Sequence, residues 1–162
     1  VYQNLPFKIT KSSIAIFLAD VLYKSINEQE SYPEMYDFIK SSLLYFDLME
    51  AGSANFHLWF LFRLTEYLGF LPDTSRVGFE GWLDIKKGAV VHFQPSHPFY
   101  ANKEATEYLM KLSALKIHEI SGFEIPRKMR DTLISVLIDY YQLHFDDLGE
   151  IKSLNVLREV FK

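Results

Sequence analysis

The sequence predicts a mostly α-helical fold, a compact domain of about six helices that carries a small β-hairpin insertion. Apolar residues recur at helical spacing in six segments. Of the 162 residues, 49% are hydrophobic and 16% aromatic, which indicates an aromatic-rich core. A glycine-rich stretch with two alternating runs interrupts the helical pattern at residues 70–101. We therefore expect residues 1–162 to form a single helical domain with an insert at 70–101.

Two helices are predicted in the first third of the chain. Apolar residues repeat at helical spacing over residues 10–26, and a hydroxyl side chain is expected at the N-cap. The candidates for that cap are Thr10, Ser12 and Ser13. Ser31 and Glu34 form a capping-box pair around Pro33, which predicts a second helix of about five turns that ends before Gly52.

The next segment combines a central helix with the insert. Apolar side chains nearly encircle a helix over residues 55–68, which predicts that other elements cover most of its sides. Gly69 suits the C′ position that closes this helix. Residues 82–85 and 89–93 alternate around the turn 86–88, so they are expected to form a short hairpin.

Three further helices are predicted after the insert. Asn102 can cap a helix that runs to about Ile117. Pro126 is expected to start the longest helix, which extends to His144. A terminal amphipathic helix follows Lys152.

Composition excludes several classes of function. The absence of cysteine removes disulfides, thiolate zinc sites, iron–sulfur clusters and cysteine nucleophiles. The net charge of −4 gives no overall positive field for nucleic acid, so a local patch or a missing domain must supply one. The apolar run 56–62 is too short for a membrane span, and we expect a soluble, cytoplasmic protein. The start at Val1, without signal-peptide features, predicts a fragment of a longer protein.

The sequence contains no signature of catalysis. It has no G-x-S-x-G serine and no glycine-rich phosphate loop, so we expect neither an enzyme nor a bound cofactor. Asp84, His92 and His97 could form a metal or enzymatic site, but the histidine spacing matches no familiar ligand pair. We therefore predict no metal and keep that site as an alternative. His57 and His144 lie in aromatic-rich helices, where a core-facing histidine is the ordinary outcome.

A basic group opens the longest predicted helix. Arg127, Lys128 and Arg130 lie at a helix N-terminus, where the macrodipole disfavours cations. A bound phosphate would offset that cost, so these residues are our candidates for DNA binding. The alternative is a solvated face balanced by Glu124 and Asp131.

A second candidate site lies in the terminal helix. Lys152 and Arg158 flank an apolar stripe that contains Leu154 and Leu157. A groove with a cationic rim would suit an acidic peptide that ends in an apolar residue. Packing of the stripe in the core is the alternative.

The order of several short motifs resembles the C-terminal region of the bacterial DNA repair protein RecO family. These motifs are the L-G-x-x-P-D turn at 68–73, the glycine-rich insert, the Y-Y-Q-L-H segment at 140–144 and the K-S-L segment at 152–154. The resemblance covers nearly the whole chain, because residues 18–46 also suit the first helices of that region.

The resemblance implies a recombination mediator. Proteins of this family bind single- and double-stranded DNA, anneal complementary strands, and act with RecR and the single-stranded DNA-binding protein in loading the RecA recombinase. The family's helical region also receives the acidic, Phe-terminated tail of the single-stranded DNA-binding protein. An N-terminal OB-fold domain would precede Val1.

The chain departs from the family at the insert. Many relatives carry a four-cysteine zinc site there, and residues 73–100 contain no cysteine, so no metal role is transferred. We expect apolar residues of the insert to hold it instead, namely Phe79, Trp82, Leu83 and Phe93. A helical scaffold that docks proteins without contacting DNA remains the alternative function.

Overall fold

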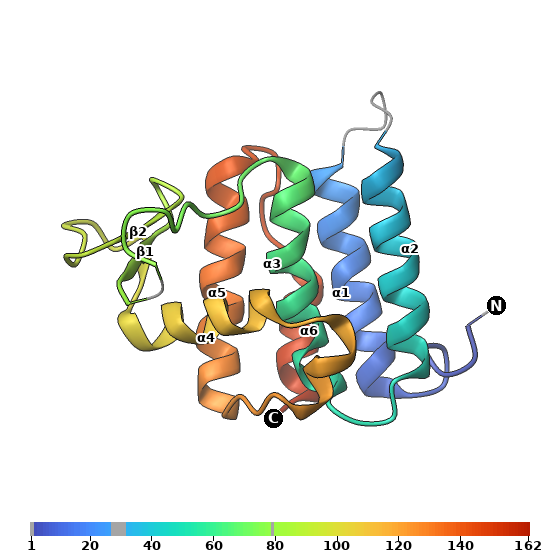
Figure 1. Ribbon diagram of the computed structural model, residues 1–162. Helices are drawn as coiled ribbons and strands as arrows, with labels where there is room; N and C mark the ends of the chain where they lie inside the picture. The colour runs from blue at the N-terminus through green and yellow to red at the C-terminus, as the bar shows by residue number, and fades with distance from the viewer. Residues whose placement is uncertain (1, 27–31, 79) are drawn as a thin grey trace.

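The structure is a bundle of α-helices with a small sheet at one side (Figure 1). It is a computed structural model that describes residues 2–26, 32–78 and 80–162. The α-helices are α1 Ile9–Ser25, α2 Pro33–Leu48, α3 Phe56–Leu68, α4 Lys103–Ala114, α5 Arg127–His144 and α6 Lys152–Val160. Two short 3-10 helices, η1 Ser53–Asn55 and η2 Ile117–Gly122, precede α3 and α5. The predicted fold class, mostly α with a small β insertion, is confirmed.

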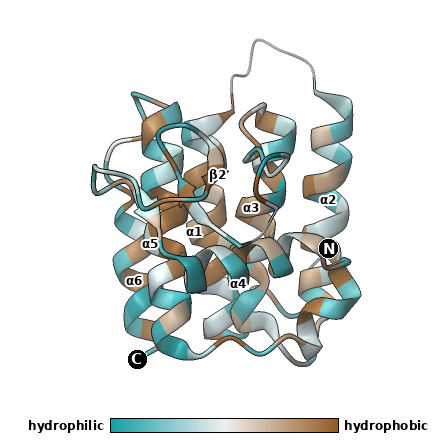
Figure 2. Cartoon of the chain, turned by 60° about the vertical axis from the view of Figure 1, so that its left-hand side comes forward, coloured by the Kyte–Doolittle hydropathy of each residue, from teal (hydrophilic) through white to brown (hydrophobic). Residues whose placement is uncertain are grey.

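Helix α3 lies at the centre of the bundle, as its encircling apolar pattern predicts. It contacts α1, α2, α4 and α5, and nine of its 13 residues are buried. Phe60 is fully buried and packs against Phe38 and Phe56, with ring centroids 5.3 and 5.7 Å away. Gly69 ends the helix in the left-handed conformation at φ 85°, which confirms its predicted role. Figure 2 shows hydrophobic residues concentrated on the inward sides of the helices.

The start of α1 differs from the prediction. Its N-cap is Lys8, which makes no side-chain cap, so the prediction of Thr10, Ser12 or Ser13 is wrong. The hydroxyl groups of Ser12 and Ser13 instead donate to carbonyl oxygens four residues earlier. Lys11, in the first turn of α1, caps the end of α2 instead, because its buried ammonium donates to three carbonyls there at 2.6–2.8 Å. The predicted cap of α2, Ser31, lies outside the described residues.

The N-terminal segment is fastened to the end of α2 through one carboxylate. The side chain of Asp47 accepts the backbone N–H groups of Gln3, Asn4 and Leu5 at 2.7–2.8 Å. Burial acts to raise the pKa of Asp47, but these three donors and nearby Lys11 outweigh it and hold the pKa below its ordinary value. The carboxylate therefore fixes the path of the chain into α1.

The last helices follow the sequence pattern closely. Asn102 caps α4 by accepting the N–H of Ala105 at 2.8 Å, as predicted. This helix ends at Ala114 rather than Ile117, and η2 takes the chain on toward α5. Pro126 precedes α5, whose 18 residues make it the longest helix. The hydroxyl of Tyr141 on α5 donates to the α3 carbonyl of Leu61 at 2.8 Å.

The insert forms a three-stranded antiparallel sheet with the order β2-β1-β3. Its strands are β1 Trp82–Asp84, β2 Ala89–Val91 and β3 Tyr100–Ala101. The predicted hairpin is confirmed in slightly shorter form. Strand β3 is missing from the prediction, because two residues are too few to show alternation. Among the predicted insert anchors, Leu83 is buried but Phe93 is 84% exposed, while Phe79 lies outside the described residues.

Two polar contacts fasten the insert to the helices. The N–H of Leu83 donates to the hydroxyl of Thr106 on α4 at 2.9 Å. The hydroxyl of Tyr140 on α5 donates to the carbonyl of Phe70, where the insert begins. Gly88, at φ 65°, lies against the same hydroxyl, and a Cβ there would be 3.0 Å from it. A glycine therefore allows the hairpin turn to approach α5.

Candidate nucleic-acid and partner-binding surfaces

The start of α5 and the face of α6 bring three arginines to one small cleft. Arg127, Arg130 and Arg158 line it together with Leu154 and Leu157. We call this site the arginine cleft. Its volume is about 20 Å³, which is enough for a water molecule or a single anionic oxygen but too little for an aromatic ring. The cleft is therefore suited to charge recognition at its mouth.

The arginine side chains of the cleft are held by neutral acceptors. The guanidinium of Arg130 donates to the carbonyl of Ile125 at 2.9 Å, and that of Arg158 donates to the hydroxyl of Ser135 at 2.8 Å. Asp131 also lines the cleft, yet within the described part of the chain none of the three arginines forms an ion pair. Their remaining N–H donors can therefore bind an incoming anion.

His57 forms part of the lining on the α3 side. Its side chain is 5% exposed, and Nδ1 has no hydrogen-bond partner. Burial, with a smaller effect of nearby Arg130, lowers the pKa of His57 from 6.5 to about 3. The imidazole is thus neutral at neutral pH, and its burial agrees with the prediction of a core histidine.

The structure brings together most, but not all, of the predicted site residues. Arg127 and Arg130, predicted for DNA, share the cleft with Arg158 and the two leucines that were predicted for a partner. Lys128 and Lys152 are exposed and do not line it. Leu157 is only 3% exposed, so this part of the α6 stripe packs in the core, as the alternative interpretation held.

A second concave surface lies between α2, α3 and the connection after α4. We call it the aromatic groove. Its volume is about 580 Å³, and its walls include Phe38, Tyr45, Trp59, Arg63 and Lys116. The indole N–H of Trp59 donates to the carbonyl of Leu115 at 2.9 Å, which fixes the ring in the wall. The groove offers an aromatic surface with two cations.

Sequence reasoning missed the aromatic groove. The sequence predicts a helix covered on most sides at Trp59 and Arg63. In the structure, the groove between α2 and the segment after α4 reaches both residues. The spacing of Trp59 and Arg63, four residues apart on one helical face, was the available signal. That signal needs the position of α2 before it indicates a groove.

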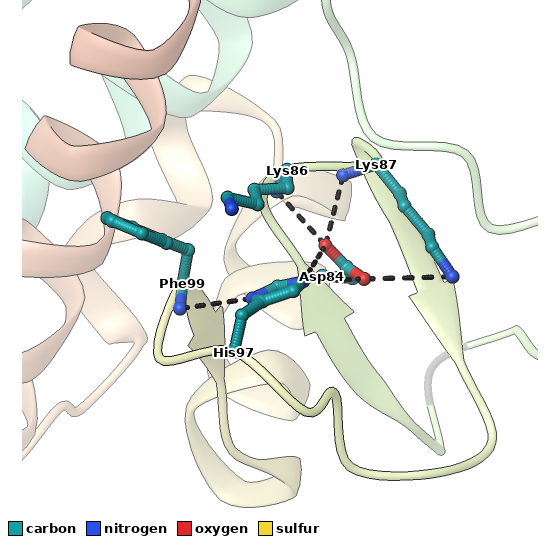
Figure 3. Close-up of polar contacts among 5 residues, drawn as sticks. All are labelled: Asp84, Lys86, Lys87, His97 and Phe99. Carbon is teal, nitrogen blue, oxygen red and sulfur yellow. Dashed lines mark hydrogen bonds and ion pairs between the residues drawn. The ribbon is translucent and has the colours of Figure 1, made fainter.

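The third polar cluster lies in the insert around Asp84 (Figure 3). The carboxylate of Asp84 is buried and accepts the N–H groups of Lys86 and Lys87, each at 3.0 Å. His97 Nε2 lies 3.3 Å from the same carboxylate, while its Nδ1 accepts the N–H of Phe99 at 3.2 Å. This network fits a neutral imidazole protonated on Nε2. It closes the hairpin turn and ties down the loop that leads to β3.

The structure therefore gives Asp84 and His97 an internal role. His92, the other residue of the metal alternative, is exposed and does not join them. Within the described ranges, no three His, Cys, Asp or Glu side chains are placed to hold a metal ion. His144 was expected on the inner face of α5, but it is exposed and stacks on Phe70 with ring centroids 4.4 Å apart.

Comparison with known proteins identifies the family. The family described as "Recombination protein O C terminal" matches residues 6–154. The chain belongs to this family. No solved structure matches the chain. In the described part of the chain, no helix combines the length and the apolar character needed to cross a membrane.

Several curated relatives carry the name DNA repair protein RecO. The chain is 32% identical to the protein from Azobacteroides pseudotrichonymphae over 151 residues, covering 93% of this chain and 63% of that protein. It is 30% identical over 160 residues to the one from Phocaeicola vulgatus, covering 99% and 66%. For Flavobacterium johnsoniae the identity is 34% over 161 residues, covering 99% and 65%. The chain thus spans about two thirds of the length of these relatives, and the family to which it belongs is one of DNA repair and recombination proteins.

Proposed function

We propose that this chain is a non-enzymatic binding domain of a recombination mediator, and that it contacts DNA phosphates through the mouth of the arginine cleft. Arg127 and Arg130 line that mouth with Arg158, and exposed Lys128 lies on the same first turn of α5. Membership of a DNA repair family supports a nucleic-acid ligand. The single observation that carries the assignment is the convergence of three arginines without an ion pair among the described residues.

Energetics favour an anion at this position. Three cations that line one small cleft repel one another, and Arg127 and Arg130 lie at the positive end of the α5 macrodipole. A phosphate oxygen would offset both the repulsion among the cations and their unfavourable interaction with the macrodipole, because it accepts charge-assisted hydrogen bonds from them. Contacts of this kind position DNA without reading its sequence, so we expect little sequence preference.

The test is a triple substitution in the full-length protein. Arg127→Ala, Lys128→Ala and Arg130→Ala together are expected to weaken binding of both single- and double-stranded DNA. The slope of log affinity against log salt should become shallower by about one unit for each lost phosphate contact. Lys40→Ala, Lys111→Ala and Lys162→Ala remove the same charge elsewhere and serve as control. Equal binding and equal slope in the two triple variants would refute the assignment.

The same proposal includes a protein partner with an acidic, Phe-terminated tail, such as the single-stranded DNA-binding protein. The sequence predicts that this tail binds Lys152, Arg158, Leu154 and Leu157. Because the arginine cleft is too small for a phenyl ring, the geometry favours the aromatic groove as its receptor. Rings of Phe38, Tyr45 and Trp59 would surround the terminal phenylalanine, and Arg63 and Lys116 would meet its carboxylates.

Peptide titration separates the two positions of the tail. An acidic peptide ending in phenylalanine is added to the full-length protein, to the Arg63→Ala variant and to the Arg158→Ala variant. If the tail docks in the groove, Arg63→Ala should weaken binding about tenfold, because the peptide loses the cation that meets its carboxylate. Arg158→Ala should change binding less than twofold, because Arg158 lies outside the groove. A larger loss for Arg158→Ala than for Arg63→Ala would instead support binding of the tail at α6.

The competing function is a protein-docking scaffold that never contacts DNA. It predicts that the peptide binds while DNA gives no signal even at low salt, so the two titrations distinguish it from the proposal. Binding of RecR is part of the proposed role on the basis of family membership alone.

A further inference from the structure

The inner end of the arginine cleft holds a polar side chain that lacks a partner. His57 lines the cleft, is 5% exposed, and has no hydrogen-bond partner for Nδ1 among the described residues. Buried polar groups in folded proteins nearly always have a partner, so an unpartnered one indicates a position for a water, an ion or a ligand. The cleft is the space from which such a partner can reach the imidazole.

Apolar rings hold the imidazole in place. Phe17 meets it edge-on, with ring centroids 6.1 Å apart, and Phe161 stacks on it at 6.3 Å. Phe161 also lines the cleft. Neither phenyl ring offers a strong hydrogen-bonding group, and together they restrict reorientation of His57. The imidazole is therefore preorganised for a group that enters the cleft.

The charge of the cleft increases from its inner end to its mouth. Burial and, to a smaller extent, the charge of Arg130 lower the pKa of His57 to about 3, so the imidazole is neutral at neutral pH. Arg130 is half-buried, whereas Arg127, Asp131 and Arg158 are exposed at the mouth. A neutral imidazole offers one N–H donor and adds no charge to the repulsion among the three arginines.

Charge favours an anionic oxygen over a water molecule as the partner of His57. A water would fit the volume of about 20 Å³ and could bond the imidazole. It would not offset the repulsion among the arginines, whereas an anionic oxygen would accept hydrogen bonds from His57 and Arg130 together. Asp131 is the carboxylate at the mouth, and within the described ranges it forms no ion pair with these arginines.

We propose that a ring N–H of His57 donates a hydrogen bond to one oxygen of a phosphate group that enters the arginine cleft, with Arg130 as the second donor to that oxygen. The arginines at the mouth then meet the remaining phosphate oxygens. The inference rests on the proposed phosphate-binding function and adds a neutral donor to it. This donor recognises an oxygen by a directed hydrogen bond, so a histidine packed among core rings belongs to the binding site.

Two substitutions of nearly equal size test this hydrogen bond. His57→Leu removes the donor, and His57→Asn keeps an amide N–H in a side chain of almost the same shape. Fluorescence anisotropy with the full-length protein and a labelled duplex oligonucleotide measures the affinity. His57→Leu is expected to weaken binding about tenfold, because a hydrogen bond to a charged group contributes a factor of about this size or more. His57→Asn should retain most of the affinity, because its amide can take over the contact.

The salt dependence separates a direct contact from an indirect one. Because the imidazole is neutral, His57→Leu should leave the slope of log affinity against log salt as in the wild type. Arg130→Ala removes a cation and should make that slope shallower. His118→Leu is the matched control, because His118 is an exposed histidine of η2 outside the cleft. Its substitution should change neither the affinity nor the slope.

A measurement on the unsubstituted full-length protein does not depend on how well the variants fold. Nitrogen-15 chemical shifts of the histidine rings are followed while inorganic phosphate is added at constant pH and ionic strength. The signals of His57 should shift and saturate. The other histidines of this chain lie outside the cleft and should stay unchanged, namely His92, His97, His118 and His144.

The outcomes that overturn the inference are distinct from failure of the proposed function. Equal DNA affinities of the leucine and asparagine variants, or His57 signals that do not respond to phosphate, would refute the hydrogen bond. A shallower salt slope for His57→Leu would mean that the residue only positions the arginines, which also refutes it. If the Arg127, Lys128 and Arg130 substitutions leave DNA binding intact, the proposed DNA contact itself fails. If they weaken binding while His57→Leu does not, the histidine contact alone is wrong.

Discussion

The helical body and the insert are stabilised by different interactions. Around α3, fully buried rings such as Phe56 and Phe60 pack against one another, and their contribution scales with the apolar area removed from water. In the insert, strands of two or three residues bury a few small apolar side chains, such as Leu83 and Val90, and add single polar contacts through Asp84, Thr106 and Tyr140. We therefore expect the body to unfold as a unit and the insert to loosen at a lower free energy. This separation lets the insert carry exposed aromatic rings without weakening the body.

The largest effect is expected from a cavity in the body. Phe60→Ala removes a ring with no exposed area, so we expect the free energy of unfolding to fall by about 3–5 kcal/mol. Urea denaturation followed by far-ultraviolet circular dichroism measures it. Phe93→Ala makes the same chemical change at an exposed position and should cost less than about 0.5 kcal/mol. Similar losses of unfolding free energy for the two variants would contradict the difference between the packed body and the insert.

The next effect concerns the acid sensitivity of the body. Because the folded-state pKa of His57 is lowered from 6.5 to about 3, the unfolded chain binds a proton between these values that the folded chain does not. Stability should therefore fall as the pH drops below about 6.5, with a contribution of about 1.4 kcal/mol per pH unit from this residue.

His57→Gln keeps a polar side chain of similar size and removes the titration. Denaturation midpoints of both proteins are measured at pH 7, 6, 5 and 4. The difference in stability between the two proteins at each pH isolates the contribution of His57, because the contributions of other groups cancel. The variant should lose less stability than the wild type over that range. Parallel curves would show that His57 accepts a proton in the folded state.

The smallest global effect is expected at the centre of the insert. Asp84→Ala leaves the N–H groups of Lys86 and Lys87 without their acceptor, at a local cost of about 1–3 kcal/mol. Hydrogen exchange should accelerate for amides of residues 82–91 and remain unchanged in α3. An equal acceleration in both regions would mean that the insert and the body form one cooperative unit.

The sequence predicts the body better than the insert, for a physical reason. Helical periodicity, the cap at Asn102 and the stop at Gly69 act through residues close in the chain, so all three could be inferred. Strand β3 and the role of Asp84 depend on partners that the fold brings together, such as His97, and a lysine cap such as Lys11 acts across 35 or more residues. These interactions leave no periodic pattern.

The candidate sites also differ in how far the sequence predicts them. The unusual position of cations at the start of α5 indicated Arg127 and Arg130, and the structure places both beside Arg158. The aromatic groove escaped prediction because its walls come from three separate segments. Phe93 was expected to be an internal anchor of the insert, and its exposure reverses that role.

The central claim is that DNA contacts the mouth of the arginine cleft and leaves the rest of the packed body untouched. A titration of the isotopically labelled protein with a thymine oligonucleotide, followed by amide chemical shifts, tests it most directly. The account predicts saturating shifts at the first turn of α5, with the α3 residues beyond His57, which lines the cleft, unaffected. Shifts confined to other surfaces, or none at low salt, would contradict it.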